Sequence, residues 1–185
     1  MMEDIKKDSV DMMEKAVESL GKEFSRVRTG RASLNLLDGV RADYYGVPTP
    51  LNQMAGLSVP EARLILIQPW DPKALEAIEK AVLKSDLGLT PQNDGKVIRI
   101  AIPMMTEERR RELVKIIRKM AEESKVGVRA ARRDANEMLK DLKKDSAISE
   151  DEAFKGQEEI QKITDSYIKK IDELLAEKEK ELLEF

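Results

Sequence analysis

Residues 107–144, EERRRELVKIIRKMAEESKVGVRAARRDANEMLKDLKK, decide the fold of this chain. Apolar and small side chains recur through this stretch every three or four positions, which is the period of a single amphipathic helix. Thr106 is a typical N-cap residue, and two acids follow it in the first helical turn. At about 1.5 Å per residue, the helix would be roughly 57 Å long. A helix of this length predicts an elongated helical bundle.

The same helix separates charge around its axis. At about 100° per residue, Lys125, Arg129 and Arg132 fall on one narrow stripe, and Arg133 lies at its edge. The helix carries 13 basic and 8 acidic side chains, whereas the chain after it carries 6 and 13. Because the acids of the helix lie mostly on another face, the stripe is predicted to bind a polyanion. The alternative is a salt-bridged bundle in which acids of a neighbouring helix neutralise the stripe.

Two further helices are predicted on either side of this one. Residues 3–28 carry apolar side chains at helical spacing, and the pattern ends at Gly30. Ser149 begins the capping-box pattern Ser-Glu-Asp-Glu, after which apolar residues again recur every three or four positions. The chain therefore predicts a three-helix bundle formed by residues 1–30 and 107–185.

Residues 31–106 have a different pattern, rich in turn residues. A helix is expected over residues 72–84, with Asp71 as its cap. Short β-prone runs occur at residues 40–45, 53–59, 64–68 and 97–102. The fold class is therefore α+β, with a small, mostly β, α/β domain inserted into the bundle. The aromatic residues of this insert are expected to anchor its core, with a partner-facing surface as the alternative: Tyr44, Tyr45 and Trp70.

Two short connectors join the insert to the bundle, and we expect them to act as hinges. Both connectors must lie at the same end of the bundle, and the basic stripe is strongest toward the remote end. The predicted hinge residues are Thr29, Gly30, Arg31, Ala32 and Ser33 in one connector and Pro103, Met104, Met105 and Thr106 in the other.

The composition excludes several classes of function. The chain has no cysteine and no histidine, so it has neither thiol chemistry nor the commonest general base and metal ligand. No apolar run reaches the about 20 residues of a membrane helix, and no signal-peptide core follows the charged amino terminus. We therefore expect a soluble cytoplasmic protein. Because no phosphate-binding loop or nucleophile elbow is present, we also expect no enzymatic activity, small-molecule substrate, cofactor or metal. A hydrolase that uses buried carboxylates of the insert is the enzymatic alternative.

Five motifs occur along the chain in a specific order and spacing: VRTGRAS at 27–33, DYYGVPTP at 43–50, SDLGL at 85–89, TEERR at 106–110 and VRAARRD at 128–134. No single motif is decisive, but together they make the sequence resemble the bacterial ribosome recycling factors over its whole length. The family pattern often has asparagine where this chain has Ala130, and proline where it has Leu34.

The resemblance implies an L-shaped, two-domain translation factor that mimics the outline of transfer RNA. It implies a monomer that binds ribosomal RNA of the large subunit and acts with elongation factor G and GTP to split post-termination ribosomes. It also implies that Arg132 is the main RNA contact, with Arg129 beside it and Arg28 as a further contact. Arg133 either joins them or pairs with Glu137 one turn away. The alternative from another functional class is a helical scaffold or adaptor without an RNA role.

Overall fold

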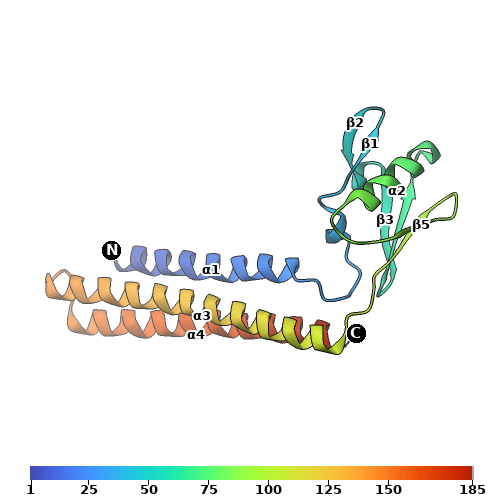
Figure 1. Cartoon of the computed structure of the whole chain (residues 1–185). Helices are drawn as coiled ribbons and strands as arrows, with labels where there is room; N and C mark the ends of the chain where they lie inside the picture. Colours follow the sequence, from blue (N-terminus) through green and yellow to red (C-terminus); the bar gives the residue numbers. More distant parts are fainter. Residues whose placement is uncertain (185) are drawn as a thin grey trace. The chain divides into compact units, whose positions relative to one another are not determined.

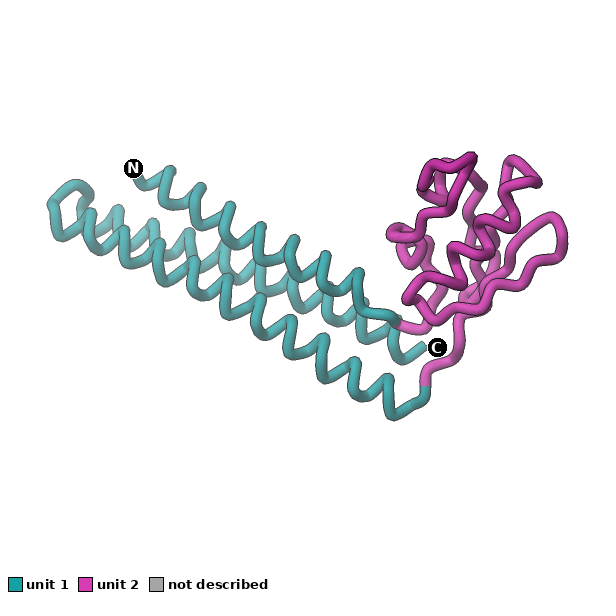
Figure 2. Tube along the Cα trace, turned by 45° about the horizontal axis from the view of Figure 1, so that its top comes forward, with its two compact units in different colours: residues 1–28, 106–184 teal, residues 29–105, 185 magenta. Residues whose placement is uncertain are grey.

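The computed structural model describes residues 1–184 and divides into two compact units (Figure 2). Unit 1 contains residues 1–28 and 106–184, and unit 2 contains residues 29–105. The long helices belong to unit 1, whereas every strand belongs to unit 2. This confirms the predicted α+β class.

Unit 1 consists of three long helices that lie side by side (Figure 1). They are α1 (Met2–Arg26), α3 (Glu107–Lys144) and α4 (Glu150–Leu183). The Thr106 hydroxyl accepts a hydrogen bond from Arg109 N at the start of α3, and Ser149 and Glu152 form a complete capping box at the start of α4. Both helices therefore begin where their capping residues predict.

The helices of unit 1 pack through small and aliphatic side chains. Met13, Ile117, Val128 and Ile171 have no exposed surface. Ser124 Oγ donates to Ala16 O over 3.1 Å, which joins α3 to α1. None of the helices within residues 1–184 combines the length and the apolar character that a membrane span requires.

Unit 2 contains two antiparallel sheets and one helix. A hairpin is formed by β1 (Arg41–Tyr44) and β2 (Val47–Pro50). A second sheet has the order β3-β4-β6-β5, with β3 (Ala55–Glu61), β4 (Leu64–Pro69), β6 (Ile98–Ala101) and β5 (Pro91–Asn93). The helix α2 (Leu75–Lys84) follows a short 3₁₀ turn, η3 (Pro72–Ala74), which Asp71 caps as predicted.

The core of unit 2 is aliphatic and lies between α2 and the four-stranded sheet. Ile65, Ile67, Ile98 and Ile100 alternate with more exposed residues along the two central strands, β4 and β6, and all four are fully buried. Alternation at this spacing turns one face of each strand toward the core. Ile78 of α2 is also fully buried and belongs to the same cluster.

The sequence patterns missed β2 and β5. Both strands contain proline, at Pro48, Pro50 and Pro91, and both lie at the edge of their sheets. Proline lacks the N–H that a central strand needs, so it is tolerated where one side of the strand is unpaired. The patterns also missed two 3₁₀ segments, η1 (Leu34–Leu37) and η2 (Leu51–Gln53).

The two connectors are both anchored within unit 2 to the turn between β3 and β4. Ala32 N donates to Ala62 O over 2.7 Å, and Ile102 N donates to Arg63 O over 2.8 Å. Gly30 has a φ of +78°, a conformation that residues with a Cβ rarely adopt. These two hydrogen bonds hold the ends of the connectors that adjoin unit 2, and they do not hold the connector residues nearer to unit 1.

Candidate nucleic-acid interface

Basic residues of α3 face acids of α4 along one side of the bundle, at a spacing of seven residues. Arg118 pairs with Glu179, and Lys125 Nζ lies 2.6 Å from Asp172 Oδ1. Seven residues make about two helical turns, so both pairs lie on one line along the two helices, which we call the α3–α4 seam. Each carboxylate raises the pKa of its basic partner, chiefly through the hydrogen bond between them.

Lys125 is largely withdrawn into this seam. Its side chain is 14% exposed, and a second carboxylate oxygen, Glu122 Oε1, lies 3.6 Å from Nζ. The structure therefore gives no support to Lys125 as a nucleic-acid contact. The faces of a single helix do not reveal this neutralisation, because the carboxylate of Asp172 comes from α4.

The seam changes at Arg132, seven residues beyond Lys125. The same spacing along α4 leads from Glu179 and Asp172 to Asp165, but Arg132 makes no ion pair with Asp165. Instead Arg132 Nη1 donates to Gln161 Oε1 over 3.0 Å, and Gln161 Nε2 donates to Asp165 Oδ1 over 2.8 Å. A neutral amide thus stands between the guanidinium and the carboxylate.

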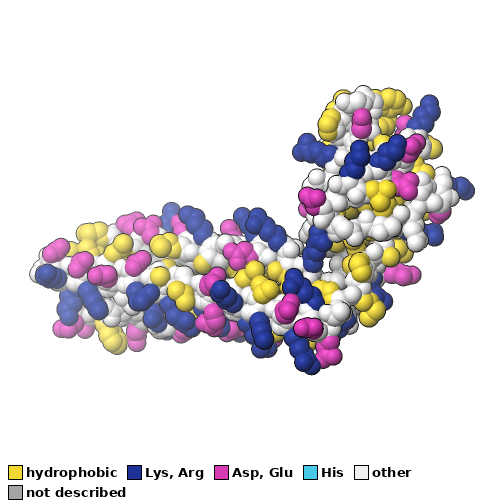
Figure 3. Space-filling view, in the orientation of Figure 1, with side chains coloured by type: hydrophobic (Ala, Val, Ile, Leu, Met, Phe, Trp, Pro, Cys, Tyr) yellow, Lys and Arg dark blue, Asp and Glu magenta, His cyan; other side chains and the backbone are white. Residues whose placement is uncertain are grey.

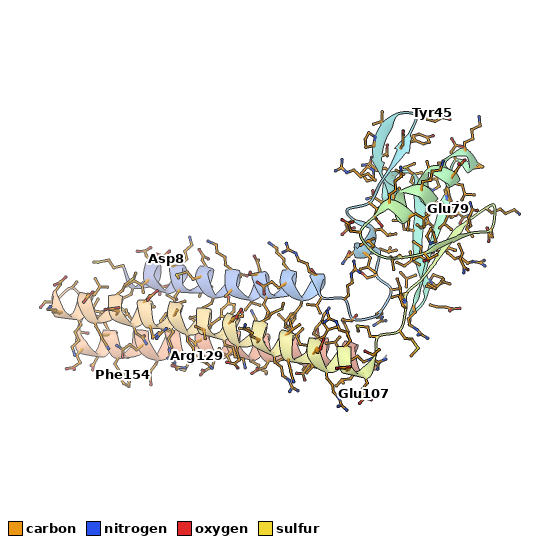
Figure 4. The ribbon with its side chains drawn as sticks, viewed as in Figure 1. Asp8, Tyr45, Glu79, Glu107, Arg129 and Phe154 are labelled. Carbon is orange, nitrogen blue, oxygen red and sulfur yellow. The ribbon has the colours of Figure 1, made fainter. Side chains whose placement is uncertain are left out.

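Arg129, which Figure 4 labels on α3, is exposed, and Arg133 is exposed one turn further along the same helix. Within residues 1–184, neither side chain has a hydrogen-bond or ion-pair partner, and Arg133 does not pair with Glu137. Val128 and Ala131 are buried beside them, which fixes the rotation of α3 about its axis. The structure therefore brings Arg129, Arg132 and Arg133 together as three arginines without a carboxylate partner.

This arginine cluster does not stand out by net charge. Figure 3 shows basic and acidic side chains alternating along the bundle. Many of these charges pair within one helix, for example Arg111 with Glu107 and Lys119 with Glu123. The cluster instead brings three arginines together within five positions of one helix, none with a carboxylate partner among residues 1–184. Guanidinium donors in this state can bind phosphate oxygens in a bidentate manner or stack on bases.

Arg28 lies apart from the cluster. It is exposed and follows the end of α1, on the side of the bundle where the connectors begin. Arg132 lies 25 residues beyond the start of α3, which corresponds to roughly 38 Å along the helix axis. The predicted site residues therefore form two separate places on unit 1.

The aromatic residues of unit 2 only partly follow the expectation that they anchor its core. Tyr44 is half-buried and packs against the core, but Tyr45 is 76% exposed and Trp70 is 68% exposed. The hydroxyl groups of Tyr44 and Tyr45 both donate to Asp71 Oδ2, over 3.3 and 3.4 Å. The core-anchor expectation is therefore wrong for Tyr45 and Trp70.

Gln161 and Asp165 were missed because their importance depends on the register between two helices. In each pair along the seam the two residue numbers have the same sum, as antiparallel helices require. Applied to Arg132, this rule predicts Asp165 as its partner on α4. The structure differs from this prediction, because Arg132 bonds to Gln161, one turn before Asp165.

Comparison with known proteins agrees with this architecture. The family model described as ribosome recycling factor matches residues 20–183. The chain belongs to the ribosome recycling factor family. The ribosome-recycling factor of Desulfatibacillum aliphaticivorans is 60% identical over 185 residues, covering 100% of both chains. That of Syntrophobacter fumaroxidans is 60% identical over 184 residues, again covering 100% of both.

Solved ribosome recycling factor structures resemble the chain along its whole length. A solution structure of the ribosome recycling factor is 45% identical, with a TM-score of 0.78, and covers 100% of this chain and 98% of that one. A second similar chain belongs to models of the T. thermophilus ribosome recycling factor and the E. coli elongation factor G bound to the E. coli post-termination complex. It is 44% identical, with a TM-score of 0.66 and 99% coverage of both chains.

Proposed function

We propose that this chain is a translation factor that acts with elongation factor G and GTP. It splits post-termination ribosomes into subunits and releases them from mRNA for reuse. Its family membership along the full length supports this proposal, as does the similar T. thermophilus factor, which is described together with elongation factor G on a post-termination complex. A factor with this role works as a monomer in the cytoplasm.

Unit 1 provides the ribosome contact in this proposal. Arg129 and Arg132, with Arg133 at the edge, bind ribosomal RNA of the large subunit, and Arg28 makes a separate contact. The observation that carries the assignment is a difference between the basic side chains along the α3–α4 seam. Arg118 and Lys125 pair with carboxylates of α4, whereas the arginine cluster has none. A phosphate would complete the pairing of the cluster.

Unit 2 and the connectors provide the link to the GTPase in this proposal. Unit 2 faces elongation factor G, and the exposed rings of Tyr45 and Trp70 suit a protein partner because aromatic side chains are enriched at interfaces. The connectors act as hinges while the GTPase moves unit 2. GTP is hydrolysed by the partner, and this chain contributes no catalytic group, cofactor or metal.

The proposal is tested with purified post-termination ribosomes. We expect the wild-type chain to split them into subunits only when elongation factor G and GTP are both present. We expect Arg132→Ala to weaken co-sedimentation with ribosomes and to make the remaining binding less sensitive to salt, because each lost phosphate contact lowers the salt slope by about 1. Alanine preserves helix propensity, so the helicity of the variant should equal that of wild type.

Arg118→Ala is the matched control. It removes the same side chain from the same helix and the same seam, but at a position where Glu179 already neutralises the charge. We expect this control to keep the affinity and the salt dependence of the wild type. If both variants bind ribosomes as the wild type does and no splitting occurs, the scaffold alternative is favoured. Turnover of a substrate by the isolated chain would favour the hydrolase alternative.

A further inference from the structure

The interruption of the α3–α4 seam at Arg132 has a specific structural cause. Two basic residues of α3, Arg118 and Lys125, meet carboxylates of α4 directly. The same register places Asp165 opposite Arg132, where a third ion pair could form. In its place, Gln161 is hydrogen-bonded to both residues.

The orientation of the Gln161 amide follows from the polarity of its two neighbours. A carboxylate only accepts hydrogen bonds, and a guanidinium only donates them. The amide therefore directs its NH₂ group to Asp165 Oδ1, at 2.8 Å, and its oxygen to Arg132 Nη1, at 3.0 Å. Reversing the amide would place two donors, or two acceptors, against each other. Asp165 thus fixes the orientation of the amide that accepts the hydrogen bond from Arg132.

We propose that Gln161, held by Asp165, is a positioning residue that keeps the charge of Arg132 available for RNA. The amide accepts one of the five guanidinium N–H groups and leaves the others unused. It also donates to Asp165 Oδ1, one of the two oxygens that would otherwise attract the guanidinium. The inference rests on the proposed function, because it concerns how the proposed RNA contact is kept competent.

The alternative arrangement shows what the amide prevents. An ion pair between Arg132 and Asp165 would give the guanidinium a permanent anionic partner, as Asp172 gives Lys125. An RNA phosphate would then have to displace a carboxylate instead of adding to a bare cation. Because release of counterions drives binding to phosphates, a cation neutralised within the protein contributes little to affinity or to its salt dependence.

Three variants of the full-length chain test the proposal in ribosome co-sedimentation. Gln161→Glu places a carboxylate directly against Arg132, so we expect binding to fall about tenfold or more and the salt slope to decrease by about 1, as for Arg132→Ala. Gln161→Ala releases Asp165 to pair with Arg132, so we expect a smaller loss of several-fold. Gln161→Ala combined with Asp165→Asn removes both the amide and the competing carboxylate, and we expect it to restore most of the lost affinity.

Two controls separate positioning from a structural effect. Gln157→Ala removes the same type of side chain one turn earlier in α4. The Gln157 side chain makes no hydrogen bond within residues 1–184, so this variant should bind ribosomes as the wild type does. Melting temperatures of all variants should stay close to that of the wild type, because Gln161 is exposed. A purely structural role of Gln161 would not be rescued by a second substitution at Asp165.

The outcomes distinguish this inference from the proposed function. If Arg132→Ala weakens binding but Gln161→Glu and Gln161→Ala do not, the positioning role is wrong and the RNA contact stands. If the double variant binds no better than Gln161→Ala, Asp165 is not the competitor and the proposal is overturned. If Arg132→Ala itself leaves binding unchanged, both the contact and its positioning are wrong.

Discussion

The proposed RNA contact depends on residue 132 being an arginine, and not only on its positive charge. Its guanidinium donates to Gln161 through Nη1 and still has further N–H groups in a fixed planar arrangement. Lysine at this position would resemble Lys125, whose compact ammonium group is drawn toward the carboxylates around it. An arginine can therefore be held by the protein and bind phosphate at the same time.

Gly30 is the connector residue with the strongest conformational requirement. Its φ is +78°, and a Cβ at this position would lie 3.3 Å from Met105 Cε. We expect Gly30→Ala to lower the free energy of unfolding of unit 2 by about 1–2 kcal/mol, since left-handed backbone is unfavourable for L-residues. Urea unfolding followed by the fluorescence of Trp70, the only tryptophan, measures the change within unit 2.

Two other variants make this prediction specific to the backbone of Gly30. Gly30→Asn should cost less than alanine, because asparagine adopts the left-handed region more readily. Gly39→Ala adds a Cβ with nothing within 4 Å, at a residue without a positive φ, so stability should be unchanged or rise by up to about 1 kcal/mol. Equal effects of alanine at Gly30 and Gly39 would contradict the assigned strain.

At the scale of the element, the start of α4 depends on charged side chains that lie at the turn between α3 and α4. Glu152 accepts a hydrogen bond from Ser149 N, and Glu150 Oε1 lies 2.7 Å from Lys143 Nζ. The bond to the Ser149 backbone holds the pKa of Glu152 below its usual value of 4.5, and the bond to Lys143 does the same for the pKa of Glu150. Both carboxylates therefore stabilise the fold in their ionised form.

This arrangement predicts a loss of stability in acid. Where the folded state has the lower pKa, the unfolded state binds more protons, so the contribution is present above the unfolded pKa and is lost as the pH falls through the folded one. We expect the melting temperature of unit 1 to fall between about pH 5 and about pH 3, and to fall less in Glu152→Gln. Glutamine keeps an oxygen for the capping bond but does not titrate.

Circular dichroism at 222 nm follows this melting because unit 1 contains the long helices. Glu158→Gln is the matched control, since Glu158 is an exposed carboxylate of the same helix without an ion pair within residues 1–184. Its pH dependence should equal that of the wild type. If Glu152→Gln and Glu158→Gln lose stability equally in acid, the capping box is not the source of the effect.

The elements that could be predicted from sequence are those whose pattern is local. The helix over residues 107–144 was predicted with its correct ends, because its period is regular and Thr106 caps it. The edge strand β5 could not be predicted, because its three residues begin with Pro91 and it pairs with β6, whereas β5 itself contains no helical or alternating pattern. Pairing with another strand is what makes such a segment a strand.

The candidate site divides in the same way. Arg129 and Arg132 follow from the helical period and the composition of a single helix. The ion pair of Lys125 and the hydrogen bond between Arg132 and Gln161 both involve α4, and the pattern of a single helix does not contain its register against α3. The exposure of Trp70 was missed because an aromatic side chain in a small domain is usually counted toward its core.

At the scale of the whole molecule, the two units have separate interiors. The aliphatic core of unit 2 includes no residue of the three long helices. The chain passes between the units twice, near residues 28–29 and 105–106. Because Ala32 and Ile102 are tied to the β3–β4 turn by backbone hydrogen bonds, we expect bending only at the few residues between these anchors and unit 1. We therefore expect each unit to move as a rigid body about a narrow hinge.

Residual dipolar couplings of the free protein in solution test this hinge. We expect the couplings of unit 1 to fit one alignment tensor and those of unit 2 to fit another with a different magnitude, since a hinge averages the two orientations unequally. The helices α1, α3 and α4 serve as the internal control, because they pack together and must share one tensor. If a single tensor fits residues of both units, the connectors hold them as one rigid body. The GTPase could then move unit 2 only by moving the entire chain.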